Sequence, residues 1–417
     1  MNAHAQQQQL QKARLLLQNN QLSDAKNILH VLANQNYSPA LVDLATLLLI
    51  DSQDKKNVID AIDLLKRAEQ QQDTSALYFL SCISLYEQTE TLDWHQLAKR
   101  IQQSITQNNA YALCDAALFL ARYGSTQQQF DSTQLLELSA LQGNITAMAL
   151  LGERLANGFC CTADPARANS IRQLALDMQL PVPKPNQAFG FTAAEPQNTP
   201  KLPEHLPSID WRKVLEFNQG IQIDERANVA LLANFLSAEE CLYVRCMGSP
   251  MLQPSISVDS TGKQHQNQIR TSSECIFNIE HEQLYLILLQ MRMASAAELP
   301  LAHAEPLILL RYLPGQEYKP HRDYLPTNYF TSVDKGGSGQ RLRTVIAYLN
   351  TPEQGGETLF PLLEKIIPAT QGQLLCFDNM DGNEQLNTLS MHAGAPVVSG
   401  VKWICTLWMR QNTHRTL

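Results

Sequence analysis

A histidine–arginine–aspartate run and a distant second histidine are the residues most capable of chemistry. His321 and Asp323 lie two positions apart, and His392 follows far downstream. Residues two apart in a β-strand point to the same face, so one strand would present the imidazole and the carboxylate together. A histidine from a neighbouring strand would complete a set of two imidazoles and one carboxylate. That set suits non-haem Fe(II), because it leaves coordination positions open.

A lysine ten residues after His392 strengthens this interpretation. Lys402 stands in the apolar segment VKWICTLWM, residues 401–409. A buried ammonium group needs an anionic partner, and the C5 carboxylate of 2-oxoglutarate is such a partner. Two other interpretations stay open: a lysine that reaches solvent from an edge strand, or an internal ion pair with Asp or Glu.

The elements that would position these residues are short apolar runs between turn residues, starting near residue 208. Their spacing predicts a β-sandwich or barrel. The runs are SISVDS from Ser255, EPLILLRYLP from Glu305, LRTVIAYLN from Leu342, GQLLCFDN from Gly372, GAPVVSG from Gly394 and VKWICTLWM from Val401. Helices are predicted at 236–247, opened by Ser237 and Glu240 as capping residues, and at 281–297.

The first 180 residues carry an internal repeat. Small residues recur at steps of 36, 36 and 35 at Ala40, Ala76, Ala112 and Ala147. A second series recurs in the other helix of each predicted pair, at Ala25, Ala61, Leu97, Thr133 and Ala168. A period of this length predicts stacked helix pairs, an α-solenoid. Aspartates near the start of each second helix are predicted to cap it: Asp24, Asp60, Asp93, Asp131 and Asp164.

Residues 181–207 interrupt the repeat with seven prolines. Proline at this density does not continue a helix or a central strand, so an extended linker is predicted. Solenoids of this kind present a concave face to a protein or peptide. The alternative is that the repeats only pack against the rest of the chain.

Composition limits the classes of function. The chain has 417 residues and a net charge of −8, with no block of Lys or Arg. This argues against binding to nucleic acid or to a membrane surface. The longest apolar stretch, residues 41–50, is too short to cross a bilayer, and no secretory signal is recognised at the start. Nine cysteines without zinc-site spacing are expected to be free thiols, and the location is expected to be cytoplasmic.

Residues 230–410 resemble the catalytic domain of prolyl 4-hydroxylase-like 2-oxoglutarate/Fe(II) dioxygenases. The matching stretches, in order, are residues 234–241, 269–273, 310–324, 339–350, 355–361 and 392–403, followed by Trp408. The resemblance implies a double-stranded β-helix, or jelly roll. GNITAMALLGERLANG, residues 143–158, resembles Sel1-like and tetratricopeptide repeats. The predicted domains are therefore a helical repeat domain at 1–180, a linker at 181–207 and a dioxygenase domain at 208–417.

The resemblance also implies roles for single residues. His321, Asp323 and His392 would bind the iron, and Lys402 would anchor the far carboxylate of 2-oxoglutarate. Tyr312 would line the cosubstrate pocket, unless it is only a core aromatic residue.

Three further residues receive roles from the resemblance. Thr344 would contact the same carboxylate through its hydroxyl. Arg341 and Trp408 would lie near the mouth and the substrate path. The alternatives are a solvated strand end for Arg341 and core packing for Trp408.

The leading hypothesis is a dioxygenase that uses Fe(II), 2-oxoglutarate and O2, with ascorbate as a further cofactor. It would hydroxylate a protein or peptide, at a prolyl residue, with the repeats recruiting the substrate. One alternative is an enzyme acting on a small molecule or a nucleic-acid base. The other is a scaffold whose dioxygenase domain is inactive.

Overall fold

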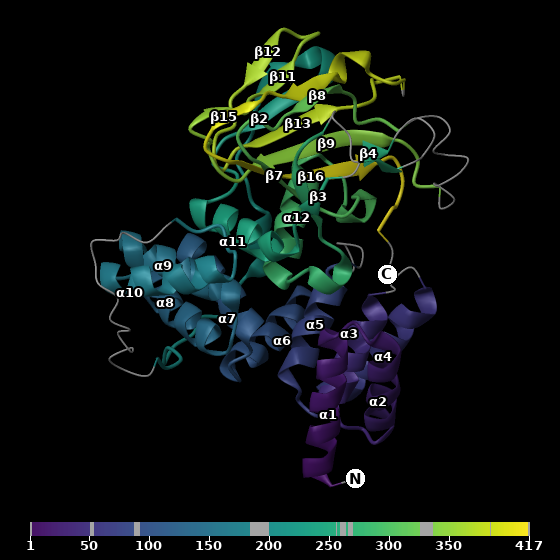
Figure 1. Ribbon diagram of the computed structural model, residues 1–417, viewed down its shortest axis with the longest axis vertical. Coiled ribbons are helices and arrows are strands. Elements are labelled where there is room, and N and C mark those ends of the chain that lie inside the picture. Colours follow the sequence, from purple (N-terminus) through teal and green to yellow (C-terminus); the bar gives the residue numbers. More distant parts are fainter. Residues whose placement is uncertain are drawn as a thin grey trace.

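The computed structural model describes residues 2–50, 54–86, 92–183, 200–255, 257–258, 264–265, 270–325, 337–383 and 385–415. Its N-terminal half is a stack of antiparallel helix pairs, in purple to blue in Figure 1. The first helices of the pairs are α1 (Ala3–Gln18), α3 (Ser38–Leu49), α5 (Thr74–Ser84), α7 (Ala110–Tyr123) and α9 (Ile145–Asn157). The second helices are α2 (Leu22–Asn34), α4 (Lys55–Glu69), α6 (Trp94–Thr106), α8 (Thr126–Leu141) and α10 (Pro165–Asp177). The predicted solenoid is confirmed.

The alanines that revealed the repeat lie where the helices touch. Ala40, Ala76, Ala112 and Ala147 are completely buried. A methyl side chain lets two helix backbones approach closely, which explains why these positions stay small while their neighbours vary.

The aspartate caps are correct for only two of the five helices. Asp93 caps α6 and Asp164 caps α10, each by accepting a backbone N–H. The other three predicted caps are wrong. Asp24 lies in the first turn of α2 without capping it, and Asp60 and Asp131 lie inside helices. The caps of α4 and α8 stand about six residues earlier, at Asp54 and Ser125, because each helix is longer than the pattern indicated.

Two facing antiparallel sheets form the C-terminal half, as the jelly-roll prediction requires. The large sheet has the order β1 (Ile221–Asp224), β2 (Val229–Leu232), β13 (Leu374–Asp378), β9 (Arg341–Tyr348), β16 (Lys402–Arg410), β7 (Ile308–Tyr312), β6 (Ser273–Ile276), β3 (Gln253–Pro254). The small sheet has the order β12 (Lys365–Ile367), β11 (Thr358–Phe360), β14 (His392–Gly394), β8 (Tyr318–His321). Apolar side chains from both sheets, such as Tyr348 and Phe360, form one core between them.

Two separate two-stranded sheets lie beside them: β10 (Gln354–Gly355) with β15 (Val397–Ser399), and β4 (Ser257–Val258) with β5 (Gln264–His265). The strand predicted from Ser255 falls partly outside the described residues. The other predicted strands are present.

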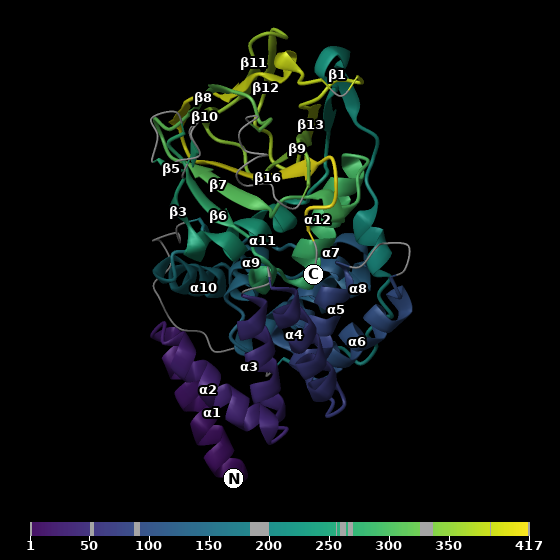
Figure 2. The same cartoon turned by 90° about the vertical axis from the view of Figure 1, so that its right-hand side faces the viewer.

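Two helices join the repeats to the large sheet. They are α11 (Ala238–Gly248), which begins with the expected capping box of Ser237 and Glu240, and α12 (Leu284–Ala296). Both lie between the repeat layer and the sheets in Figures 1 and 2. One continuous apolar core runs from Tyr78 in the repeats to Met409 in the last strand. The two halves are therefore packed together as one body rather than tethered.

The described ends of the proline-rich segment contain no helix or strand at 181–183 and 200–207, which agrees with the linker prediction. Residues 184–199 lie outside the described residues. Val182 is buried, and Leu202 and Leu206 pack against the shared core. Among the described residues, no helix is both long and apolar enough to span a membrane.

Candidate active site

Neighbouring strands of the small sheet bring the two histidines together. His321 ends β8, His392 begins β14, and the two residues are paired in register. Asp323 lies just beyond the end of β8, so the expectation that alternation within one strand places it is wrong. Nevertheless, one ligand atom from each of the three side chains lies within 4.8 Å of the others.

Backbone carbonyls orient both imidazoles. His321 Nδ1 lies 2.8 Å from the carbonyl oxygen of Lys319, and His392 Nδ1 lies 3.0 Å from that of Ser390. A carbonyl only accepts, so each Nδ1 carries the proton and each Nε2 keeps a free lone pair. These Nε2 atoms are 3.5 and 3.6 Å from the carboxylate oxygens of Asp323. Three donor atoms therefore converge on one point.

A buried hydrogen-bond chain holds the carboxylate in place. The hydroxyl of Thr344 donates to Asp323 Oδ2 at 2.8 Å and accepts from Asn379 Nδ2 at 2.8 Å. The hydroxyl of Thr344 is therefore directed to the carboxylate of Asp323, while its predicted contact with 2-oxoglutarate stays a prediction. The sequence alone did not indicate that the Thr344 hydroxyl would bond the carboxylate of Asp323.

The charge states of the three groups suit metal binding. Burial opposes ionisation of Asp323, but His392 and His321 hold the pKa of its carboxyl well below the usual range. Burial, reinforced by His321, lowers the pKa of His392 to about 4. The site at neutral pH thus offers an anionic carboxylate and a neutral imidazole, the protonation states that a metal requires.

Replacing Thr344 with valine is expected to weaken iron binding by about 10- to 100-fold while leaving the ligands present. The physical reason is that valine keeps the shape of threonine but releases Asp323 Oδ2 and Asn379 Nδ2. The measurement is a ferrous-iron titration of the full-length protein. Thr344→Ser, which restores the hydroxyl, should recover most of the affinity; equal loss in both variants would contradict the role.

The predicted anion anchor lies on the same cavity as the histidines. Lys402 begins β16, is only 3% exposed, and borders this cavity together with His321, Asp323 and His392. Its Nζ lies 5.6 Å from the ring of Tyr312 and 5.9 Å from that of Tyr348. No described residue forms a hydrogen bond or ion pair with it. A buried ammonium without a protein partner is suited to an anionic ligand.

Tyr312 borders this cavity, as do two residues that received no role, and its part in binding the cosubstrate stays a prediction. Tyr312 is buried opposite Lys402 in the register of β7 and β16. The ring of Tyr318 stacks on His321 with centroids 3.4 Å apart. The guanidinium of Arg270, buried and paired with Glu274, lies 5.3 Å from the Tyr318 ring. Tyr318 stands three positions before His321, and this closeness in sequence was the only indication that it would lie at the site.

Arg341 is not a solvated strand end. Its guanidinium binds Glu305 through two hydrogen bonds of 2.7 Å and donates to the backbone carbonyl of Asp323 at 3.2 Å. It also stacks 3.5 Å from the ring of Trp408, which borders the cavity. Arg341 therefore fixes the loop that carries the carboxylate. Its placement at a substrate path stays a prediction, as does that of Trp408.

A 2OG-Fe(II) oxygenase superfamily model matches residues 307–410, which include every candidate ligand. Arabidopsis thaliana prolyl 4-hydroxylase 1 is 37% identical over 199 residues, covering 44% of this chain and 69% of that protein. Probable prolyl 4-hydroxylase 9 from the same plant is 30% identical, and the match covers 53% of this chain and 88% of that protein.

Two solved structures are each similar to part of the chain. The viral collagen prolyl hydroxylase of Paramecium bursaria Chlorella virus-1 is 26% identical, with a TM-score of 0.34, covering 44% of this chain and 95% of that one. A Sel1 repeat protein from Oxalobacter formigenes is 17% identical, with a TM-score of 0.33. The match covers 43% of this chain and 80% of that one.

The two-sheet fold and the His–Asp–His site define a 2-oxoglutarate/Fe(II)-dependent dioxygenase. Within that class, the chain belongs to the prolyl 4-hydroxylase family. Two imidazole nitrogens, one carboxylate and an adjoining cavity fit ferrous iron, and the unpartnered ammonium of Lys402 fits the cosubstrate.

Proposed function

We propose that this protein hydroxylates a prolyl residue in a protein or peptide, and that its helical repeats recruit the substrate. One observation carries the catalytic part: three metal-binding side chains and one unpartnered ammonium share a single cavity in a prolyl 4-hydroxylase family member. Iron, 2-oxoglutarate and O2, when bound, would supply the oxidising chemistry: one oxygen atom of O2 would enter succinate, formed with CO2 from 2-oxoglutarate, and the other would convert a substrate C–H into C–OH.

The side chains around the cavity would bind and shield these groups. His321, Asp323 and His392 would hold the iron, while Lys402 would pair with the far carboxylate of 2-oxoglutarate. The rings of Phe377 and Phe360 lie 4.7 and 5.8 Å from that of His392. An apolar wall at this point excludes water from the reacting atoms.

The recruiting role is supported by an aromatic cluster on the repeats. Tyr78, Phe79 and Tyr111 lie with ring centroids 5.6 to 6.4 Å apart. They border a cavity of 340 Å³ between the repeats and the segment before α12. Tyr111 is 39% exposed. Aromatic faces of this kind bind extended, proline-containing peptides.

The test is to incubate the pure protein with ferrous iron, 2-oxoglutarate and proline-containing peptides, and to seek the mass gain of one oxygen atom. Tyr111→Ala is expected to raise the peptide KM by about tenfold at unchanged kcat, the cost of one lost stacking contact. Phe130→Ala, which removes an exposed aromatic ring from α8, is the matched control. Turnover confined to free amino acids would contradict the peptide substrate, and equal peptide KM values in the two variants would contradict the recruiting role.

Lys402 predicts how cosubstrate use depends on pH. Burial lowers the pKa of its ammonium to about 8, although Glu357 opposes the shift. The charged form therefore predominates below that pH, and above it each pH unit reduces the charged fraction about tenfold. We expect kcat/KM for 2-oxoglutarate, followed as succinate release, to fall between pH 8 and 9. Lys402→Arg stays charged throughout, so the same decline in that variant would contradict the assignment.

Ascorbate as a reductant and a cytoplasmic location complete the proposal. All nine cysteines are free thiols, which supports a reducing compartment. The two points are tested by sustained turnover with and without ascorbate, and by locating the full-length protein in cell fractions.

A further inference from the structure

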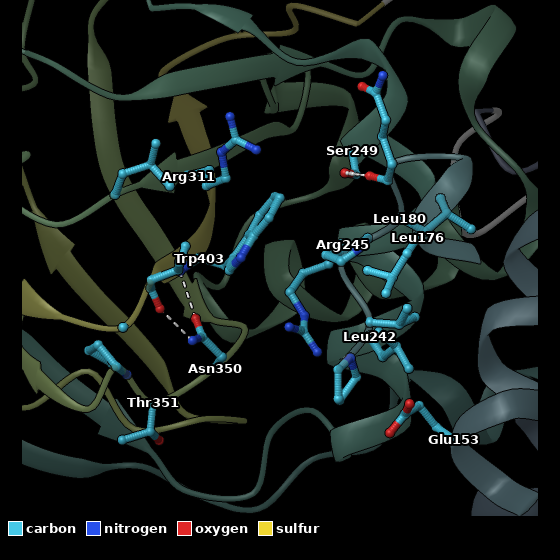
Figure 3. Close-up of a pocket in the computed structure, with 18 of the residues that line it drawn as sticks. Glu153, Leu176, Leu180, Leu242, Arg245, Ser249, Arg311, Asn350, Thr351 and Trp403 are labelled. Carbon is cyan, nitrogen blue, oxygen red and sulfur yellow. Dashed lines mark hydrogen bonds between the residues drawn. The ribbon is translucent and has the colours of Figure 1, made fainter. Parts of the chain in front are cut away.

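A cavity of 550 Å³ lies where the repeats and the first linker residues meet the outer face of the large sheet. Figure 3 shows its lining, with Glu153 from α9, Arg245 from α11, and Arg311 and Trp403 from β7 and β16. In the sheet register, Arg311 pairs with Trp403 and the next pair is Tyr312 with Lys402. Successive residues of a strand face opposite sides, so this cavity lies behind the sheet and is separate from the metal site.

Two arginines border this cavity without a hydrogen-bond or ion-pair partner among the described residues. Neither Arg245 nor Arg311 forms a hydrogen bond or an ion pair with any residue that the structure describes. The Nε atom of each is buried and unsatisfied. The Arg311 guanidinium lies 5.7 Å from the Trp403 ring, and Figure 3 shows all three side chains at the cavity. Two partly buried guanidinium groups without counter-ions form a site suited to negative charge.

The acidic groups nearby do not neutralise these arginines. Glu153 is held by Arg172 through two hydrogen bonds of 2.7 and 2.9 Å. Glu353 is exposed at the rim. Burial lowers the pKa of Arg245, and Cys246, Cys241 and Glu153 offset that effect only in part.

The rest of the lining mixes apolar residues with polar ones such as Ser249, Asn350 and Thr351. Leu176, Leu242 and Trp403 line it, together with prolines from both halves of the chain. A second cavity of 430 Å³ adjoins the first and shares Leu242 and Arg245 with it. Volumes of this order are typical of sites for small molecules, which place a few polar groups within an apolar lining.

We propose that this cavity binds a small organic anion with two negative charges and an apolar or flat body. The charges would pair with Arg245 and Arg311, and the body would rest on Trp403 and Leu242. This anion site does not depend on the proposed prolyl substrate. If either assignment fails, the other is unaffected.

The test uses full-length, anaerobic protein loaded with iron and saturated with 2-oxoglutarate, so that the cosubstrate site is filled. Phenyl phosphate, adenosine 5′-monophosphate and phthalate are titrated separately by calorimetry. We expect one-to-one binding of at least one probe. Binding of the first two alone indicates a phosphate ester with a ring, and binding of the third alone indicates a dicarboxylate.

Substitutions locate the probe. Arg245→Gln and Arg311→Gln are each expected to weaken binding at least about tenfold, the loss of one charge-assisted contact. Thermal melting verifies that both variants remain folded, and Arg311→Lys should retain part of the affinity. Arg14→Gln removes an equal charge from the distant α1 and should change nothing. Failure of all three probes to bind at millimolar concentration, or binding unaffected by both glutamine variants, would overturn the proposal.

Discussion

Replacing Asp323 with asparagine is expected to reduce 2-oxoglutarate turnover by at least about a thousandfold. The carboxylate supplies the only negative charge in the three-residue set, and its oxygens lie 3.5 and 3.6 Å from the two imidazole nitrogens. Asparagine has nearly the same shape and can still accept the hydrogen bond from Thr344. The expected loss therefore reports charge and metal binding rather than a change of fold.

Succinate release and bound iron per protein molecule measure the effect of Asp323→Asn. Both should fall together, while the melting temperature stays near that of the unsubstituted protein. Asp177→Asn, which alters an exposed carboxylate at the end of α10, should leave both values unchanged. Wild-type iron content with full turnover in Asp323→Asn would show that the metal ligands lie elsewhere.

The candidate metal ligands were predictable because their chemistry is local to a motif. His321 and His392 belong to segments whose order along the chain is characteristic of one fold, and that fold pairs them in register. The position of Asp323 was predicted from the wrong geometry, since the strand ends at His321. Its side chain is held by Thr344 and its backbone carbonyl by Arg341, contacts 21 and 18 residues away that no local pattern reveals.

Contacts between residues far apart in sequence also explain why the packing of the repeats against the sheets was not predicted. Proline density predicted an extended linker after the repeats, and gave no indication that the two halves pack together. In the structure, Arg154 of α9 binds Glu239 of α11 at 2.6 and 2.9 Å, across 85 residues of sequence. Tyr78 of α5 accepts a hydrogen bond from the backbone N–H of Leu284 at the start of α12. Such contacts depend on tertiary packing, and the capping residues alone gave no sign of them.

The second large effect is expected at this junction, where Glu240 lies between two arginines. Its carboxylate is only 1% exposed and accepts hydrogen bonds from Arg122 of the repeats and from Arg292 and Tyr285 of α12. It also accepts the backbone N–H of Ser237 at 2.7 Å, closing the capping box of α11. One carboxylate thus joins three helices and both halves of the protein.

Glu240→Gln is expected to lower the free energy of unfolding by about 3–5 kcal/mol, because it leaves two guanidinium groups without their shared counter-ion. Arg292 has a completely buried side chain, and the pKa of Arg122 is lowered by burial and by repulsion from Arg292. Glutamine can still accept hydrogen bonds, but it does not offset two positive charges.

Calorimetric melting of the full-length protein measures this loss. Because one apolar core spans both halves, we expect the repeats and the sheets of Glu240→Gln to unfold together at a lower temperature. Glu216→Gln, at an exposed position without such partners, provides the matched control. Since Glu240 does not border the metal cavity, turnover well below the melting temperature should be unchanged. Melting at the control's temperature would mean that the charge cluster adds no stability and that apolar packing alone holds the halves together.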